Sequence, residues 1–191
     1  MTKRAKTLTP QDLKRTLNYI STKRHAARNR LLVILMFNTG IRVSEAASLR
    51  FCDMLDEQGN IKREIYLRPD QTKGGEGRSI FINNQLFKEL HSYIKQFKSA
   101  DLSKKLIYSQ KKSSDGFTPN TLCQYYYYLF KGACIDGATS HSPRRSFITT
   151  LASKGVGIRV LASLAGHRSI QTTMVYIDAN DDQKRAAVEL I

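Results

Sequence analysis

The chain has 191 residues, a length that suits one well-packed domain better than two, and its 31 Lys and Arg against 16 Asp and Glu give a formal net charge of +15. This charge favours a polyanionic partner over basicity that serves solubility alone. Three scattered cysteines exclude a disulfide framework or a CxxC zinc site and indicate a reducing cytosol, and the longest apolar run, residues 31–37, is too short to span a bilayer.

A short basic tail, residues 1–8, precedes the first predicted helix. Thr9 and Pro10 have the order of an N-cap and a first helical residue. A second helix, predicted from about residue 27, is apolar on most sides and should therefore be buried. It ends before Gly40, which suits the left-handed conformation of a C-cap.

A third helix is predicted over residues 41–49, with Arg42 near its start. An arginine between two apolar helices should be partly buried, and a buried arginine needs an acidic partner or an anion. Glu45, one helical turn later, is the nearest partner. A solvent-exposed Arg–Glu pair is the alternative, and this segment alone does not decide between them.

Residues 64–68 and 78–82 alternate apolar and polar side chains, which predicts two short β-strands. The glycine-rich tip of this hairpin, residues 69–77, presents Lys73. A lysine on a flexible tip can be carried into a site by loop closure, although most lysines at turns are only solvated.

Helical patterns resume at residues 84–97 and 119–134. Four consecutive tyrosines, residues 125–128, circle the second of these helices, so one or two rings should pack in the core and the others should be exposed. Lys131 follows them, where it can contact a phosphate.

His141 and Arg144 lie at the start of the next predicted helix. Ser142 and Pro143 suit its N-cap and first position, which leaves Arg144 in the first turn and His141 just before it. Both side chains can then point at an anion near the positive end of the helix dipole.

The last part of the chain combines a short helix, a box of polar residues and a tail. After a break at residues 154–157 and the short helix, His167 follows Gly166, and Tyr176 comes nine residues after His167. Residues 181–191 predict a small apolar helix that needs a surface to dock on. Together these elements predict a mainly α fold with a small antiparallel β-hairpin at one edge.

Six residues form a set that suits phosphoryl transfer through a protein nucleophile. Two arginines can clamp the non-bridging oxygens, an acid can protonate the leaving oxygen, and a tyrosine can attack when cationic groups surround the phosphorus. The six are Arg42, Lys73, His141, Arg144, His167 and Tyr176.

These residues lie in motifs that resemble the tyrosine recombinase (phage integrase) family. Residues 39–45 resemble its first arginine box, residues 72–74 its hairpin lysine, residues 141–144 its His-x-x-Arg box and residues 164–176 its final box. The four boxes occur in order over about residues 9–176. The resemblance implies the catalytic-domain fold of that family.

For the chemistry, the resemblance implies that Tyr176 attacks a scissile DNA phosphate. The products are a 3′-phosphotyrosyl link and a free 5′-hydroxyl. Lys73 is implied as the general acid for the leaving 5′-oxygen, and His141 as a base or donor toward the tyrosine and the phosphate. Because the phosphotyrosine conserves the bond energy, neither ATP nor a catalytic metal is required, and no cofactor is expected.

For the phosphate, the resemblance implies that Arg42 and Arg144 hold its oxygens, with His167 as a further donor. Glu45 is implied as a supporting residue that orients Arg42. Arg145, Arg168 and Lys131 are expected as further DNA contacts.

The implied partner is double-stranded DNA with inverted-repeat sites, recombined through a Holliday junction in a cytoplasmic, nucleoid-associated protein. A homotetramer is expected on DNA, and a monomer or weak dimer without it. Residues 9–180 are expected to form the catalytic domain, and the helix of residues 181–191 is expected to be exchanged between subunits.

Two departures from the family's pattern are Pro143 and Arg145, where leucine and histidine are common. The helical core-binding domain typical of the family has no counterpart in this sequence. The chain is therefore either a catalytic domain alone or a short member like the fimbrial-switch invertases, and the initiating Met1 and basic tail favour the short member.

Two other functions fit the same residues. A type IB topoisomerase shares the tyrosine and the arginines, and a DNA-binding regulator can keep the fold without the chemistry. Retention of all six groups argues against the regulator. DNA inversion, integration into or excision of a mobile element, and resolution all remain open.

Overall fold

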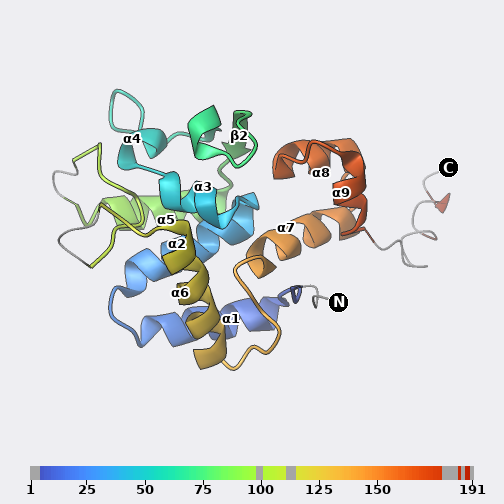
Figure 1. Ribbon diagram of the computed structural model, residues 1–191, viewed down its shortest axis with the longest axis horizontal. Coiled ribbons are helices and arrows are strands. Elements are labelled where there is room, and N and C mark those ends of the chain that lie inside the picture. The colour runs from blue at the N-terminus through green and yellow to red at the C-terminus, as the bar shows by residue number, and fades with distance from the viewer. Residues whose placement is uncertain (1–4, 98–100, 111–114, 178–184, 186–187, 190–191) are drawn as a thin grey trace.

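Helices make up most of the computed structural model, which describes residues 5–97, 101–110, 115–177, 185 and 188–189 (Figure 1). The helices of this part are α1 (Pro10–Ser21), α2 (Ala26–Thr39), α3 (Val43–Ser48), α4 (Phe51–Met54), α5 (Asn84–Ile94), α6 (Pro119–Gly132), α7 (Ser142–Ser153), α8 (Ile158–Ala165) and α9 (Ile170–Met174). Strands β1 (Glu64–Leu67) and β2 (Arg78–Phe81) form one antiparallel hairpin. The mainly α fold with a small hairpin is thereby confirmed.

Two parts of the sequence-based prediction fall largely outside these residues. They are the C-terminal helix over residues 181–191 and the start of the basic tail. Within the described ranges, no helix combines the length and the apolar character needed to cross a membrane.

Helix α2 forms the centre of the fold. Its residues 31–36 are at most 1% exposed, and the helix packs against α1, α5 and α7. A helix that is apolar on every side is expected to be surrounded in this way. It ends at Gly40, whose positive φ of 63° is the left-handed C-cap that the sequence predicts.

The local signals for helix starts are confirmed at α1 and α6. The Thr9 hydroxyl accepts a hydrogen bond from the amide of Asp12 (3.0 Å), and the Asp12 carboxylate accepts one from the amide of Thr9 (3.0 Å). Thr118 caps α6 in the same way. Within α6, Tyr126 is fully buried while Tyr127 and Tyr128 are exposed, as predicted.

Helix α7 begins one residue earlier than predicted. His141 occupies the N-cap, and Ser142 is already helical. The Ser142 hydroxyl accepts a hydrogen bond from the amide of Thr139 (2.9 Å), so it stabilises the preceding turn instead of capping the helix. Arg144 still lies in the first turn, as expected.

The hairpin packs on the core through one face. Ile65 pairs with Ile80 across the two strands, and both side chains are buried. Its tip opens with a short 3-10 turn over Pro69–Gln71. Figure 1 draws the hairpin at the top centre, next to the corner that α8 and α9 form in red, with α7 running below that corner.

Candidate active site

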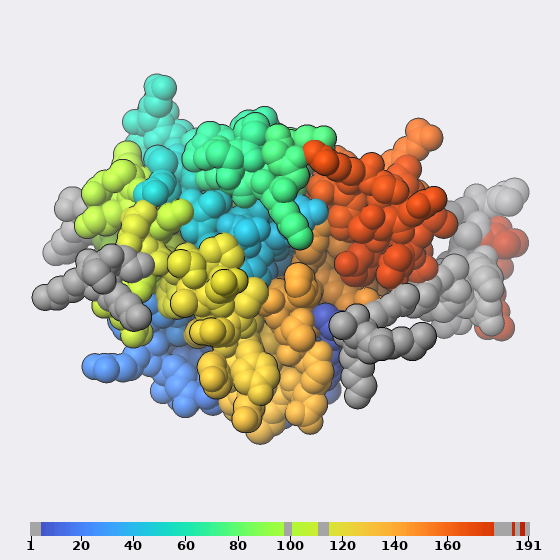
Figure 2. All heavy atoms as spheres, in the orientation of Figure 1, coloured from blue at the N-terminus to red at the C-terminus, as the bar shows by residue number. Residues whose placement is uncertain are grey.

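A hollow of about 580 Å³ is lined by all six residues that the sequence predicts as a catalytic set. They come from α3, the hairpin tip, the start of α7 and the segment around α9. Figure 2 shows the parts of the chain that meet here, with the hairpin in green, α6 in yellow, α7 in orange and α9 in red. The lining also includes Ala5, Val43, Ser44, Pro119, Cys123, Arg145, Thr172 and Val175.

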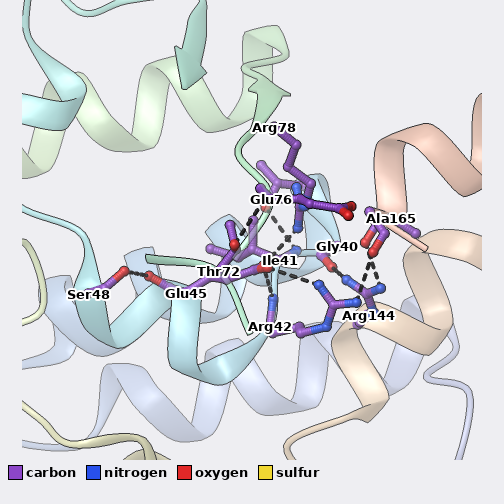
Figure 3. Close-up of polar contacts among 12 residues, drawn as sticks. Gly40, Ile41, Arg42, Glu45, Ser48, Thr72, Glu76, Arg78, Arg144 and Ala165 are labelled. Atoms are coloured by element: carbon purple, nitrogen blue, oxygen red, sulfur yellow. Dashed lines mark hydrogen bonds and ion pairs between the residues drawn. The ribbon is translucent and has the colours of Figure 1, made fainter. Parts of the chain in front are cut away.

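The buried side chain of Arg144 joins the ends of two other helices. Its Nη1 donates to the carbonyl of Gly40 (2.7 Å) and its Nη2 to the carbonyl of Ala165 (2.6 Å; Figure 3). Gly40 has little room for a side chain, because a Cβ there would lie 2.4 Å from the ring of Phe147, one turn beyond Arg144. The close contact between α2 and α7 therefore fixes the backbone of Arg144 relative to the end of α2.

Arg42 and Glu45 form a buried pair at the start of α3. Nη1 of Arg42 donates to Oε1 of Glu45 (3.0 Å), and the amide of Arg42 donates to Oε2 (2.6 Å). The Glu45 side chain is 0% exposed, whereas 28% of the Arg42 side chain is accessible. This settles the open alternative in favour of a buried pair whose guanidinium reaches the surface of the hollow.

The two arginines are held by consecutive carbonyl groups at the C-terminal end of α8. Nη2 of Arg42 donates to the carbonyl of Gly166 (3.0 Å), next to the Ala165 carbonyl that binds Arg144. Carbonyls at a helix C-terminus have no partner within the helix and carry partial negative charge, so they suit guanidinium groups. Burial, with Arg42 nearby, lowers the pKa of Arg144 to about 10, so that it remains a cation at neutral pH.

His167 lies half-buried between these arginines and Tyr176. Its Nδ1 lies 2.8 Å from the hydroxyl of Thr173, and its ring stacks on that of Tyr176 with centroids 6.0 Å apart. Burial, reinforced by the charges of Arg144 and Arg42, lowers the pKa of His167 to about 4. The imidazole is therefore neutral at neutral pH.

Tyr176 follows α9 directly and is held from two sides. In addition to the stacking on His167, the guanidinium of Arg145 lies 5.5 Å from the centre of its ring. Arg145 is itself fixed, because its Nε donates to the hydroxyl of Thr7 (3.0 Å).

Lys73 and His141 are the exposed members of the set. Lys73 lies on the hairpin tip, which is closed by a hydrogen bond from the Thr72 hydroxyl to the carbonyl of Glu76 (2.9 Å). His141 stands at the N-terminus of α7. Both line the hollow.

Arg168 and Lys131, expected as DNA contacts, lie in different places. Arg168 binds the hairpin tip, where Nη2 donates to the carbonyl of Gly74 (2.5 Å) and pairs with Glu76 (3.1 Å). Lys131 is exposed in the last turn of α6, whereas α6 lines the hollow through Pro119 and Cys123 in its first turns. The structure thus brings Arg145, but not Lys131, to the hollow.

Sequence reasoning missed two residues that support the site. Thr173 contacts His167 across a turn that carries no periodic signal. Arg78 reaches from β2 to Glu45, with Nη2 donating to Oε2 (2.7 Å). The sequence did contain a signal for Arg78, because the alternation of the strand places it on the same inward face as Ile80 and Ile82.

The hollow is cationic in character and suits an anion. In the described ranges, His, Cys, Asp and Glu side chains nowhere gather in threes or more as metal ligands would. The arginine N–H groups that are not bonded to carbonyls or to Glu45 remain for a ligand with several acceptor oxygens, such as a phosphate diester.

Comparison with known proteins gives one family. The model of the Phage integrase family matches residues 6–183. Tyrosine recombinase XerA of Pyrococcus furiosus is 30% identical over 184 residues, which cover 96% of this chain and 61% of that recombinase. The chain thus spans less than two thirds of this relative's length.

Solved structures show the same fold. A crystal structure of XerA recombinase matches 100% of this chain and 65% of its own, with a TM-score of 0.76 and 26% identity. The Tn1549 transposon integrase, in complex with a circular intermediate DNA, matches 100% of this chain and 67% of its own, with a TM-score of 0.79 and 24% identity.

Proposed function

The chain belongs to the phage integrase family, and from this premise we propose that it is a site-specific recombinase that cuts and rejoins DNA through a 3′-phosphotyrosyl intermediate. The observation that carries the proposal is the single hollow lined by Arg42, Lys73, His141, Arg144, His167 and Tyr176. These are the groups that a tyrosine nucleophile needs around a phosphodiester.

Arg42 and Arg144 bind the non-bridging oxygens of the scissile phosphate. Each guanidinium has five N–H groups, and each uses only some of them on carbonyls or on Glu45, so donors remain for phosphate. Both side chains are anchored before the DNA arrives. Donors fixed in this way stabilise the charge that develops at phosphorus without further reorganisation.

His167 is the third donor to the phosphate. A neutral imidazole donates from only one ring nitrogen, and the hydroxyl of Thr173 lies next to Nδ1. When this hydroxyl donates to Nδ1, the proton resides on Nε2, which then donates to a phosphate oxygen. Thr173 thus selects the tautomer that binds DNA.

Strand cleavage forms one bond and breaks one. The Tyr176 oxygen bonds to phosphorus, its proton passing to His141, and the bond between phosphorus and the 5′-oxygen breaks. Lys73 gives its proton to the leaving oxygen, which becomes a free 5′-hydroxyl. Attack of a 5′-hydroxyl from the other site on the phosphotyrosine reverses these steps and joins the strands into a Holliday junction.

The DNA partner is a duplex with inverted-repeat sites, one repeat for each protomer of a homotetramer. The net charge of +15 supplies the general attraction to the backbone. Arg145 contacts DNA beside Tyr176, Arg168 does so after leaving the hairpin tip, and Lys131 binds backbone phosphates further along the duplex. Residues 9–180 act as the catalytic domain, and the tail over 181–191 docks on a neighbouring protomer.

Strand exchange is favoured over the two alternatives. The named relatives include tyrosine recombinases and the TnP I resolvase of Bacillus thuringiensis, 29% identical over 168 residues. A type IB topoisomerase and a silent regulator have less support, since the boxes and relatives are those of recombinases and all six groups are present.

The test is capture of the covalent adduct. Fragmented DNA of the source genome is incubated with the protein, the mixture is denatured, and DNA that remains bound to protein is sequenced. We expect recurrent inverted repeats. A nicked duplex that carries the recovered site then traps the adduct, because the short strand beyond the nick diffuses away and religation fails.

Tyr176→Phe is the control for the nucleophile. It should bind the recovered site and form no adduct, and an adduct that persists in this variant would overturn the assignment of Tyr176. Site-specific binding by the wild type without any adduct would indicate the silent regulator. Relaxation of supercoiled DNA without joining of two sites would indicate the topoisomerase.

A further inference from the structure

We propose that Arg78 is a positioning residue that holds the Lys73 hairpin in place against the phosphate-binding arginines, an inference that rests on the proposed strand transfer. Arg78 opens strand β2, five residues after Lys73. Its side chain turns inward toward α3, where Figure 3 draws it close to Glu45. It touches no reacting atom and acts through Glu45 and through its own strand.

The carboxylate of Glu45 is the common anchor of two elements. It accepts two hydrogen bonds from Arg42, one from the amide and one from Nη1, and a third from Nη2 of Arg78 (2.7 Å). The ion pair between Arg78 and Glu45 is nearly closed to solvent, with side-chain exposures of 11% and 0%. A buried charged hydrogen bond of this kind fixes geometry more firmly than a pair on the surface.

The shape of the surrounding backbone also confines Arg78. A Cβ on Gly166 would lie 2.4 Å from Nε and 2.5 Å from Cδ of Arg78, so the side chain passes directly beside Gly166. Nε and Nη1 of Arg78 are buried and have no hydrogen-bond partner within the described part of the chain. Arg78 therefore keeps its place through one ion pair and close packing.

A second anchor holds the other end of the same loop. The buried carboxylate of Asp53 accepts hydrogen bonds from Nη1 of Arg68 (2.8 Å) and from Nε2 of Gln71 (3.0 Å). Residues 72–77, which include Lys73, are thus anchored at Asp53 on one side and at Glu45 on the other, while Arg168 contacts the tip through Gly74 and Glu76 at the surface. Loss of Arg78 removes the ion pair with Glu45, which connects the C-terminal end of this loop to the phosphate-binding arginines.

Arg42 does not depend on Arg78 in the same way. Without Arg78, Glu45 still accepts both hydrogen bonds from Arg42, and Arg42 still donates to the carbonyl of Gly166. The expected defect therefore lies in proton delivery by Lys73 to the leaving oxygen. It does not lie in binding of the phosphate.

The chemical test uses a leaving group that needs no acid. Single-turnover cleavage is measured on the nicked duplex recovered above, once with the natural 5′-oxygen and once with sulfur in its place, because a thiolate departs without a proton. Since general acids contribute about 10²- to 10⁴-fold, Arg78→Met should slow cleavage of the oxygen substrate by about 100-fold and that of the sulfur substrate by less than about 5-fold. Arg78→Lys, which can keep a bond to Glu45, should recover much of the loss.

The matched control is Arg63→Gln. Arg63 precedes β1 in the same hairpin, donates to Asn84 and stacks on Phe87, so its loss removes one charge but no contact of the site. This variant should cleave both substrates at the wild-type rate. Equal slowing of both substrates by Arg78→Met would overturn the proposal, because Arg78 would then support the arginines or the fold as a whole.

A second measurement, hydrogen exchange, needs no DNA. Hydrogen exchange of peptides that cover residues 64–82 should be faster in Arg78→Met than in Arg63→Gln, while exchange in α2 stays unchanged. Unchanged exchange in the hairpin would refute the anchoring role. If the wild type forms no adduct on any DNA, the proposed function fails, and this measurement still decides whether Arg78 holds the hairpin.

Discussion

The imidazole of His167 stacks on the phenol ring of Tyr176, with 17° between the ring planes. The nucleophile of the proposed reaction is therefore held by a residue that also faces the two arginines. Helix α9 lies between the two residues in the sequence and brings their rings together. A change in the charge of His167 should consequently affect the whole site.

Acid should destabilise the fold through His167. Its pKa of about 4 lies below the ordinary value of 6.5, so between these values the unfolded chain binds a proton that the folded chain does not. The contribution of His167 to the free energy of unfolding is complete above about pH 6.5 and is lost as the pH falls toward 4. The free energy of unfolding lost in this way stays below ~3 kcal/mol, because solvent reaches part of the ring.

Urea denaturation at several pH values between 4 and 7 measures this loss. His167→Gln should remove that component of the pH dependence, whereas His91→Gln, on the exposed face of α5, should retain the wild-type profile. An unchanged profile in His167→Gln would show that other groups cause the acid sensitivity.

Gly166→Ala should destabilise the protein more than an alanine at another left-handed glycine. Gly166 has a φ of +62°, and a Cβ there collides with Arg78, whereas Gly155 has a φ of +79° and no atom within 4 Å of its Cβ position. Gly155→Ala should cost about 1 kcal/mol from backbone strain alone, and Gly166→Ala about 3 kcal/mol with the collision added. Chemical denaturation of the two variants isolates the collision, and equal losses would argue against it.

Arg144→Lys should abolish most cleavage while leaving DNA binding within about 3-fold of wild type. A lysine cannot bond two carbonyls and still offer a fork of donors to phosphate. Loss of one such preorganised contact costs about 10²- to 10³-fold in rate. The single-turnover rate on the recovered site measures this, with Arg159→Lys on the exposed face of α8 as the control.

Deletion of residues 181–191 should prevent tetramer formation on DNA without affecting cleavage of a single nicked site. The segment is apolar at Ala186, Ala187, Val188, Leu190 and Ile191, which suits docking on another protomer. Sedimentation of the complex with two sites measures the assembly. Tetramers and recombination products that survive the deletion would contradict the proposed exchange.

The helices could be predicted well because their limits depend on neighbouring residues. Thr9 and Gly40 carry their signals within one turn of the helix that they begin or end. Helix α4 was missed, since its four residues are too short to show a periodic pattern. The start of α7 was placed one residue late because the Ser142 hydroxyl is used by the preceding turn.

The residues that line the site could be predicted from the sequence, but most of the hydrogen bonds and ion pairs between them could not. Boxes of sequence identified the six lining residues, and the i, i+3 spacing identified the pair of Arg42 and Glu45. The bond from Arg78 to Glu45 joins residues 33 positions apart, and no local pattern encodes such a contact. Similarly, the pairing of Arg168 with Glu76 depends on how the hairpin packs beside α8.

The end of α8 couples the two arginines of the site to each other. Arg42 and Arg144 are both fastened to its last carbonyls, at Gly166 and Ala165. A fluctuation that frays this helix end removes one anchor from each arginine at once and leaves Arg42 on Glu45 and Arg144 on the carbonyl of Gly40. Helix ends open at a low cost in free energy. In the proposed reaction, an opening at this one place therefore disturbs both phosphate-binding arginines together.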